Sequence, residues 1–199
     1  MQKSFYDAIK DRRSIYAISG ESPVGEERIA EVVGQAIKHV PSAFNSQSAR
    51  VAILFGEAHQ KLWNITMETL RKIVPPKDFP QTEEKIRSFA AGYGTILYFD
   101  DTTVTEGLMQ QFPLYRENFP VWAQQSNGML QFAVWTSLEQ EGLGATLQHY
   151  NPLIDEEVKK TWNLPQSWKL IAQMPFGKPT AEPDAKETLP VEQRMLQFH

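Results

Sequence analysis

Apolar residues recur every three, four or seven positions along several stretches of the chain, a spacing that places them on one face of an α-helix. The clearest example spans residues 29–40 and ends before Pro41, because proline disfavours helical geometry in the residue that precedes it. The same spacing predicts further helices over residues 3–13, 57–74, 82–91, 121–140 and 155–162.

Four shorter apolar runs predict β-strands, over residues 51–55, 95–99, 145–149 and 168–174. Helices interleaved with short strands indicate an α+β or three-layer α/β/α domain, and 199 residues fit one such domain. The alternation also allows a doubly wound parallel sheet. That fold places a glycine-rich turn directly after a strand, whereas the glycine pair of residues 92–94 precedes a strand and that of residues 142–144 follows a helix.

Two segments suggest that the chain meets a second subunit. The predicted helix 121–140 is apolar nearly all round, which indicates burial on most sides, and Gly128 inside it favours a close helix contact. Residues 178–199 contain three prolines and four acidic residues, so they are predicted to be extended. We expect this C-terminal arm to lie across another surface, such as a partner subunit.

Composition and charge narrow the function classes. Hydrophobic residues make up 41% of the chain and charged residues 22%, as in ordinary globular proteins. A net charge of -4 argues against general nucleic-acid binding. The sequence has no apolar run of membrane-spanning length and no signal-peptide pattern at its start, so we expect a soluble, cytoplasmic protein without membrane contact.

The sequence lacks the residues that several kinds of catalytic site require. The chain has no cysteine, which excludes disulfides, thiolate metal sites and a cysteine nucleophile. Its four histidines show no short ligand spacing, and there is no G-x-S-x-G nucleophile elbow. We therefore expect neither a metal centre nor a serine hydrolase.

Arg12, Arg13 and Ser14 stand at the C-terminal end of the first predicted helix. One interpretation is favourable charge against the helix dipole. The other is a guanidinium fork for a phosphate group, with a hydroxyl beside it. Lys178, which follows Phe176 and Gly177, could add a second phosphate-binding cation or could be a solvated surface lysine.

A second polar cluster runs from Pro41 to Gln47, between a helix and a strand. Its small and amide side chains suit a ligand that is anionic at one end and a polar heterocycle at the other, although a solvated turn uses the same residues. A third cluster follows the strand predicted at residues 145–149. There His149 and Tyr150 are either packing residues or ligand contacts.

Three motifs in this order resemble the nitroreductase-like FMN flavoproteins. They are Arg12-Arg13-Ser14-Ile15-Tyr16, Pro41-Ser42-Ala43-Phe44-Asn45-Ser46-Gln47 and Phe176-Gly177-Lys178-Pro179. In its short length and in residues 148–152, the chain resembles the small subgroup typified by the fungal fatty-acid-repression-mutant type proteins. The resemblance implies a three-layer sandwich with a central, mostly antiparallel sheet, in an intertwined homodimer that holds two FMN molecules at its subunit interface.

The resemblance also assigns roles to residues, and it covers residues 1–199 as a single domain with an arm from 178 to 199 that reaches across the partner subunit. Arg12, Ser14 and Lys178 are expected to hold the FMN phosphate. The segment from Leu147 through Gln148 and His149 to Tyr150 is expected to lie by the isoalloxazine ring. The residues expected to reach the flavin from the other subunit are Pro41, Ser42, Ala43, Phe44, Asn45 and Gln47.

One departure from the family pattern concerns the flavin's charge. Many members carry a cation two residues after the motif serine, where this chain has Tyr16. The absence of this cation is expected to lower the reduction potential of the flavin, unless Arg13 supplies the positive charge instead.

The implied activity is a ping-pong oxidoreductase that takes hydride from NADH or NADPH and reduces a small aromatic acceptor, such as a nitroaromatic or a quinone. A flavin-binding regulatory or stress-response protein with little turnover is the alternative that Tyr16 motivates. A non-catalytic dimeric interaction domain is a third.

Overall fold

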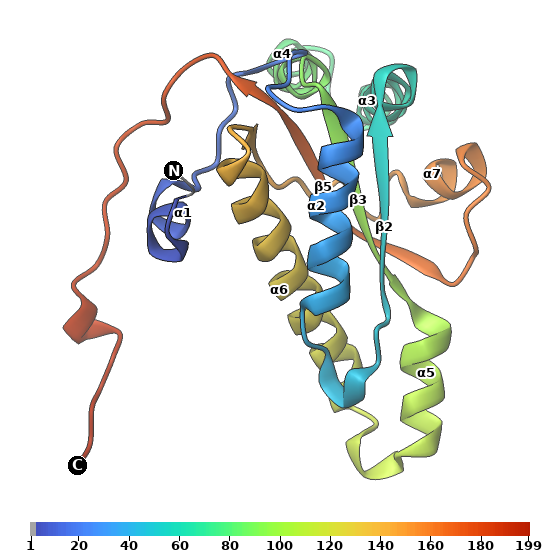
Figure 1. Cartoon of the computed structure of the whole chain (residues 1–199). Coiled ribbons are helices and arrows are strands. Elements are labelled where there is room, and N and C mark those ends of the chain that lie inside the picture. Colours follow the sequence, from blue (N-terminus) through green and yellow to red (C-terminus); the bar gives the residue numbers. More distant parts are fainter. Residues whose placement is uncertain (1–2) are drawn as a thin grey trace.

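The computed structural model describes residues 3–199 as a five-stranded sheet with helices on both faces (Figure 1). The strand order is β1-β5-β3-β2, with β4 also paired to β5, and every pairing is antiparallel. The strands are β1 (Ile18–Ser19), β2 (Ala49–Phe55), β3 (Gly94–Asp101), β4 (Gly144–Ala145) and β5 (Trp168–Pro179). The predicted three-layer α+β sandwich is confirmed, and the parallel alternative is wrong.

The α-helices divide between the two faces of the sheet. Helices α2 and α6 cover one face, and α3, α4 and α7 cover the other (Figure 1). The helices are α1 (Phe5–Asp11), α2 (Glu26–His39), α3 (Gly56–Arg71), α4 (Phe79–Ala90), α5 (Thr102–Gln111), α6 (Asn118–Gln140) and α7 (Asp155–Thr161). Single 3-10 turns are η1 (Ala43–Asn45), η2 (Pro113–Tyr115) and η3 (Val191–Gln193).

Strand β3 lies in the middle of the sheet and serves both cores. Because successive side chains of a strand point to opposite faces, Ile96 and Tyr98 pack with α2 and α6, while Leu97 and Phe99 pack on the other side. All four are fully buried. This is why residues 96–99 form a continuous apolar run rather than an alternating one.

Helices α2 and α6 follow the predicted pattern. Ile29, Val33 and Ala36 of α2 are buried, and α2 ends at His39 just ahead of Pro41. Helix α6 begins at Asn118, three residues before its predicted start, so that Pro120 lies in its first turn. Backbone amides of a first turn have no acceptor within the helix, so a proline there costs no hydrogen bond.

The predicted ends of other elements were less accurate. Strand β5 runs to Pro179 rather than to residue 174, because its last residues pair with β1 and β4. The predicted strand 145–149 is reduced to β4 and an isolated bridge between Gln148 and Gln173. Phe79 and Pro80 open α4 instead of extending a loop, since proline is tolerated in a first turn.

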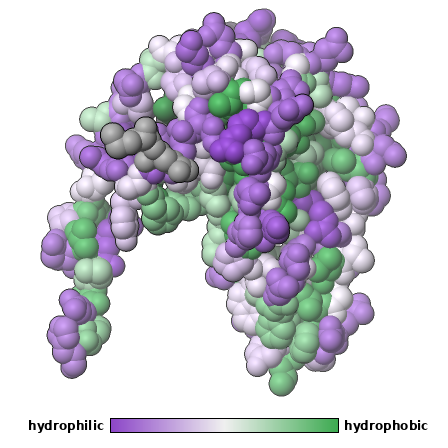
Figure 2. Space-filling model, viewed as in Figure 1, coloured by the Kyte–Doolittle hydropathy of each residue, from purple (hydrophilic) through white to green (hydrophobic). Residues whose placement is uncertain are grey.

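The C-terminal arm stands away from the body of the chain. After β5 the backbone leaves the sheet and continues as an exposed, mostly irregular segment to His199 (Figure 1). The space-filling view shows a hollow between this arm and the rest of the molecule (Figure 2). The arm is mostly irregular and exposed, and what it lies against remains a prediction.

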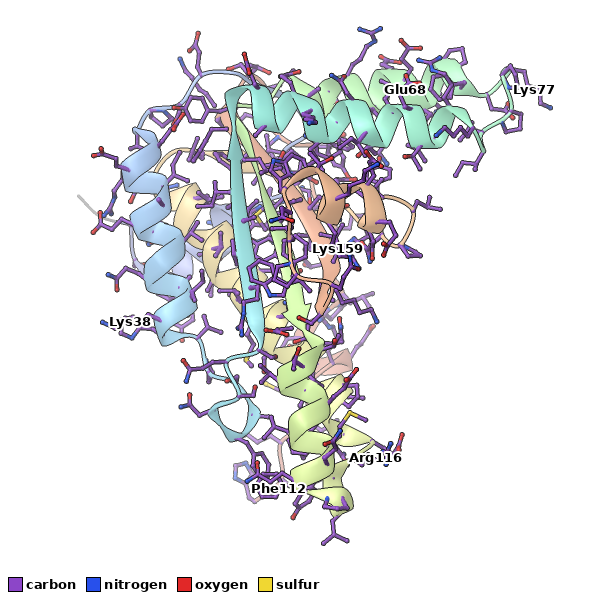
Figure 3. All side chains as sticks on the ribbon, turned by 90° about the vertical axis from the view of Figure 1, so that its right-hand side faces the viewer. Lys38, Glu68, Lys77, Phe112, Arg116 and Lys159 are labelled. Carbon is purple, nitrogen blue, oxygen red and sulfur yellow. The ribbon has the colours of Figure 1, made fainter. Side chains whose placement is uncertain are left out.

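Charged side chains point outward from the helices, as Lys38 and Glu68 illustrate, while Phe112 and Arg116 lie at the tip between α5 and α6 (Figure 3). Across residues 3–199, none of the helices has both the length and the apolar character needed to cross a membrane.

A buried histidine joins α3 to the sheet. Trp63 Nε1 donates to Thr95 Oγ1 at 3.0 Å, and His59 Nδ1 lies 2.8 Å from the same oxygen. His59 Nε2 lies 3.1 Å from the Ala90 carbonyl, which can only accept, so this nitrogen carries the proton of a neutral ring. The Thr95 hydroxyl then donates to Nδ1, so both ring nitrogens of His59 and the Trp63 indole have hydrogen-bond partners.

Burial lowers the pKa of His59 below its ordinary value of 6.5, and the Ala90 carbonyl offsets part of that shift. The unfolded chain therefore binds a proton at a higher pH than the folded chain. This contribution to stability is complete above about pH 6.5 and is lost as the pH falls below it.

The free energy of unfolding can be measured with urea at about pH 7.5 and at about pH 5. We expect it to fall more between these two pH values in the parent protein than in His59→Gln, because only the parent loses the contribution of His59. Equal drops would contradict this role.

Candidate functional site

Arg12 caps the C-terminus of α1 and lies half-buried against α6. Its guanidinium carbon is 4.4 Å from the centre of the Trp135 ring, a cation–π contact. Its buried Nε has no hydrogen-bond partner within residues 3–199. Burial, followed by the charge of Arg13, lowers the pKa of Arg12. An anion placed here would supply both the missing acceptor and the missing countercharge.

Arg13, Ser14 and Tyr16 line a cavity of about 500 Å³ between the chain that follows α1 and the C-terminal arm. Arg13 Nη2 donates to the Asp184 carbonyl of the arm at 2.6 Å. Ser14 is exposed. Tyr16 is half exposed, with its ring 6.1 Å from that of Phe89. These groups form an open polar surface rather than a closed pocket.

Backbone pairing brings three of the predicted segments together. Ser14 bridges to Ala145, and β4 pairs with the end of β5 next to Lys178. A side-chain carbon on Gly177 would come within 2.2 Å of the Ser19 carbonyl oxygen, so only glycine fits at this position. The motif of residues 176–178 therefore has a structural reason as well as a functional interpretation.

The Lys178 side chain pairs with a carboxylate of its own chain rather than with Arg12 or Ser14. Its ammonium forms a 2.8 Å ion pair with Glu21, and this hydrogen bond raises the pKa of Lys178. Both side chains are largely exposed. Within residues 3–199, Arg12 and Lys178 do not together line the cavity beside Arg13 or the cavity beside the turn.

The segment that follows β4 is clamped to β5. The amides of Thr146 and Gln148 donate to the carbonyls of Pro175 and Gln173, at 3.2 and 2.7 Å. Because alternate amides of such a segment point in opposite directions, those of Leu147 and His149 point away from β5. Neither amide has a hydrogen-bond partner in the described part of the chain.

The side chain of Gln173 completes this clamp. It is fully buried, and its Oε1 accepts the amide of Tyr150 at 2.7 Å, while its Nε2 finds no partner among residues 3–199. Burial, with a smaller effect of Tyr16, raises the pKa of Tyr150 to about 12, so its phenol stays protonated at neutral pH. Gln173 was not among the predicted site residues.

Replacing Gln173 by Met removes the acceptor and leaves the partly buried Tyr150 amide unsatisfied. We expect the free energy of unfolding to fall by about 1–3 kcal/mol and amide exchange at Tyr150 to accelerate. Gln173→Glu keeps an acceptor oxygen and should restore slow exchange at Tyr150. Slow exchange in Gln173→Met would show that the clamp does not depend on this side chain.

The turn from Pro41 to Gln47 forms the second part of the candidate site. Phe44, Asn45 and Gln47 all have positive φ angles, of 56°, 51° and 48°. A bulky aromatic residue is rarely found there, and such strain concentrates at functional sites. The Ser42 hydroxyl accepts the Gln47 amide at 3.0 Å, which closes the turn.

An aromatic cluster holds the side chain of Phe44. Its ring centre lies between 5.0 and 6.0 Å from those of four other rings and is stacked on that of Trp122 at an angle of 20°. Half of the Phe44 side chain nevertheless remains exposed. The four rings belong to Phe112, Tyr115, Phe119 and Trp122.

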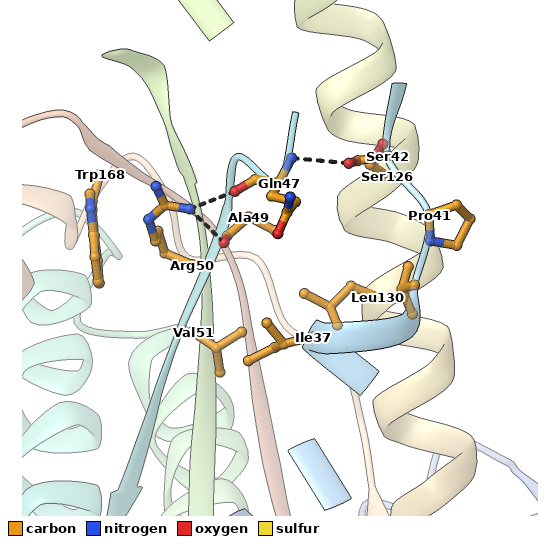
Figure 4. Close-up of a pocket in the computed structure, with 11 residues that line it drawn as sticks. Ile37, Pro41, Ser42, Gln47, Ala49, Arg50, Val51, Ser126, Leu130 and Trp168 are labelled. Atoms are coloured by element: carbon orange, nitrogen blue, oxygen red, sulfur yellow. Dashed lines mark hydrogen bonds between the residues drawn. The ribbon is translucent and has the colours of Figure 1, made fainter. Parts of the chain in front are cut away.

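A cavity of about 350 Å³ opens beside this turn (Figure 4). Pro41, Ser42 and Gln47 line one side of it, and Arg50 lies on another. Arg50 donates to the Gln47 carbonyl at 2.7 Å and pairs with Asp101 at 3.0 Å. It therefore fixes the end of the turn to the start of β2.

One chain does not bring the two parts of the site together. The turn rests on Trp122, near the start of α6, and Arg12 rests on Trp135, near its end. Thirteen residues separate these tryptophans, which is about 20 Å along a helix that rises about 1.5 Å per residue. Both tryptophans are half-buried, and each lies beneath one part of the candidate site.

Comparisons with known proteins identify the family. The profile of the nitroreductase family matches residues 9–178. The nitroreductase FRM2 of Saccharomyces cerevisiae is 35% identical over 185 residues, 92% of each chain.

The chain belongs to the nitroreductase family.

Solved nitroreductases agree with this assignment. The structure of CinD from Lactococcus lactis in complex with chloramphenicol is 42% identical, with a TM-score of 0.91, over 98% of this chain and 100% of CinD. The structure of CinD in complex with 4-nitrophenol is 43% identical in sequence, with a TM-score of 0.90 and the same coverage of both chains. A structure from Desulfovibrio desulfuricans in complex with FMN shares the fold, at 18% identity and a TM-score of 0.70, over 100% of this chain and 99% of that chain. Like its relatives, this nitroreductase family member is an oxidoreductase.

Three residues that support the candidate site were not predicted from the sequence. Trp135 supports Arg12, Gln173 holds the Tyr150 amide, and Arg50 holds the turn. A polar residue inside the apolar run 170–176 was the available signal for Gln173, because a buried amide needs a partner. Residues 3–199 contain no cluster of histidine and carboxylate side chains able to hold a metal ion.

Proposed function

We propose that this family member is an FMN-dependent oxidoreductase that uses NADH or NADPH to reduce nitroaromatics, quinones or related electron-poor aromatic acceptors. The observation that carries the proposal is the half-buried Arg12, stacked on Trp135 beside Ser14, with an Nε that nothing within residues 3–199 satisfies. The acceptor class is supported by CinD, which was solved with chloramphenicol and with 4-nitrophenol, both nitroaromatic compounds.

The donors at the Arg12 end fit the phosphate of FMN. A phosphate oxygen is among the strongest acceptors for a guanidinium, and Ser14 adds an exposed hydroxyl two residues further on. Arg12 and Ser14 therefore hold the phosphate in this proposal. Lys178 contributes only if its ammonium leaves Glu21. Arg13 is the cation nearest in sequence to Tyr16, and it must give up the Asp184 carbonyl to act there.

The segment from Leu147 to Tyr150 supplies the polar edge for the ring system. FMN, when bound, supplies the hydride-accepting and electron-carrying chemistry of the reaction. The outward amides of Leu147 and His149 donate to the ring, while the clamp of Gln148 and Gln173 keeps them in place. The nicotinamide leaves before the acceptor enters, so both use one site in turn.

A second copy of the chain completes the site. The turn and Arg12 lie at levels of α6 about 20 Å apart, which favours a turn supplied by a second copy over a turn from the same chain. In this proposal the turn of one protomer reaches the FMN of the other, and residues 178–199 lie across the partner. The residues contributed by the turn are Pro41, Ser42, Ala43, Phe44, Asn45 and Gln47.

The purified protein is expected to be yellow, or to become yellow with added FMN, and to bleach when NADH or NADPH is added without oxygen. Arg12→Ala should weaken FMN binding by about tenfold or more, measured by fluorescence titration, because a charge-assisted contact to phosphate is lost. The control is Arg87→Ala, which removes a largely exposed arginine of α4. A protein that cannot take up FMN would overturn the proposal, and unchanged affinity in Arg12→Ala would remove Arg12 from the site.

Mixed dimers test whether the site is shared between copies. Arg12→Ala and Phe44→Ala should each reduce nitroaromatics slowly, because each damages both sites of its own homodimer. A heterodimer of the two variants, isolated with two affinity tags, has one site with both defects and one with none. We expect about half of the parental rate to return. No recovery would mean that Arg12 and Phe44 act within one chain.

A second candidate function is a flavin-binding regulatory protein with little turnover. The observation that favours it is Tyr16, which stands where a cation is common in the family and packs near Phe89. Tight FMN binding with very slow bleaching by both nicotinamides would support this alternative.

A further inference from the structure

Two tyrosines stand on a buried pair of aromatic rings. Trp63 and Phe89 are almost fully buried, and their ring centres lie 5.0 Å apart. The Tyr16 ring lies 6.1 Å from that of Phe89, and the Tyr150 ring lies 6.0 Å from that of Trp63, edge-on at 85°. Because the buried pair is closely packed, it fixes the two tyrosine rings relative to each other.

The two phenol groups are free to bind a group from outside the chain. The described residues accept no hydrogen bond from either hydroxyl, and neither oxygen is a buried atom without a partner, so both are open to solvent. Burial raises the pKa of Tyr150 to about 12, and the charge of Tyr16 adds to this shift, so the two phenol oxygens lie near each other. Tyr150 therefore keeps its proton at neutral pH and can donate it in a hydrogen bond.

Both phenols adjoin the segments that the proposed function assigns to FMN. Tyr16 lines the same cavity as Ser14. Tyr150 directly follows His149, whose outward amide has no partner among residues 3–199. Ser14 also bridges to Ala145, at the start of that segment. A planar ligand that extends from Ser14 to the His149 amide is therefore bordered by both phenols.

The cavity beside Tyr16 offers little free positive charge. Arg13 Nη2, on one wall, is held by the Asp184 carbonyl at 2.6 Å. The arm, which forms the other wall, carries three carboxylates and one ammonium group, those of Glu182, Asp184, Glu187 and Lys186. This wall therefore opposes additional negative charge on a bound ring.

We propose that Tyr16 and Tyr150 donate hydrogen bonds to one carbonyl oxygen of the bound flavin ring, and so hold its polar edge with two neutral donors. The inference rests on the proposed function, which places FMN beside them. A carbonyl oxygen has two lone pairs and accepts both hydrogen bonds. Neutral donors stabilise negative charge on the reduced ring less than a cation does, because charge-assisted hydrogen bonds are about twice as strong.

The infrared spectrum of bound FMN tests the two hydrogen bonds directly. FMN labelled with carbon-13 at C2 or at C4 allows each ring carbonyl to be followed separately. A hydrogen bond lowers the stretching frequency of a carbonyl, so we expect the band of one carbonyl to move to higher frequency in Tyr16→Phe and the same band to move in Tyr150→Phe. Both variants keep the aromatic ring and its packing. Tyr6→Phe, which removes a phenol that is 81% exposed on α1, should leave both bands in place.

Tyr16→Lys tests the electrostatic consequence, because it replaces a neutral donor by a cation. Reduced FMN should then bind more tightly relative to oxidised FMN by about tenfold or more, which raises the reduction potential by about 30 mV for a two-electron couple. The potential is measured by spectroscopic titration against a dye of known potential. Tyr16→Phe should lower the potential, because the reduced ring loses a hydrogen bond.

The outcomes separate this inference from the proposed function. A protein that takes up no FMN would overturn both. Bound FMN that a nicotinamide bleaches, with both carbonyl bands unmoved in the two phenylalanine variants, would overturn the tyrosine pair and leave the oxidoreductase proposal standing. Shifts of two different carbonyls, or a potential that Tyr16→Lys leaves unchanged, would also overturn the pair.

Discussion

A continuous helix of 23 residues cannot bring its own ends together, and this constraint shapes the whole molecule. Arg12 and the segment after β4 are fixed at one end of α6, and the turn with Phe44 is fixed at the other. Each end presents only part of a ligand-binding surface. The chain therefore folds completely as one sandwich while its candidate site stays divided in two.

Both parts of the site contain groups that the isolated fold leaves unfavourable. A buried guanidinium nitrogen of Arg12 lacks an acceptor within residues 3–199, and the turn keeps Phe44 in a left-handed conformation. Each feature costs on the order of 1–3 kcal/mol. The cores on both faces of the sheet supply the stability that holds such groups in place. A bound anion would supply the missing acceptor and would relieve the cost at the Arg12 end.

Sequence patterns predicted the helices and strands whose apolar residues are buried. They failed where the extent of a strand depends on which other strands pair with it. Strand β3 was evident because both of its faces are buried. The end of β5 was missed because Pro175, Gly177 and Pro179 read as breakers, although antiparallel pairing with β1 and β4 carries the strand through them. Period and propensity contain no information about which distant segment will supply a partner.

The same limit applies to the site. Motif resemblance indicated Arg12, Ser14 and the turn from Pro41, but it could not separate residues that touch a ligand from residues that support them. Trp122 and Trp135 looked like two more apolar positions of α6, yet each carries one half of the site. Lys178 looked like a phosphate ligand, whereas in the folded chain its ammonium is paired with Glu21.

The sheet also connects the site to the face that does not carry it. Gln173 lies in β5 among residues that are fully buried, and its carboxamide oxygen reaches the amide of Tyr150, whose ring packs with the α3 and α4 core near Trp63. The end of the clamped segment is therefore held from behind the sheet as well as by β5, so a substitution in the α3 core that shifts Tyr150 would act on this segment without touching its outward amides.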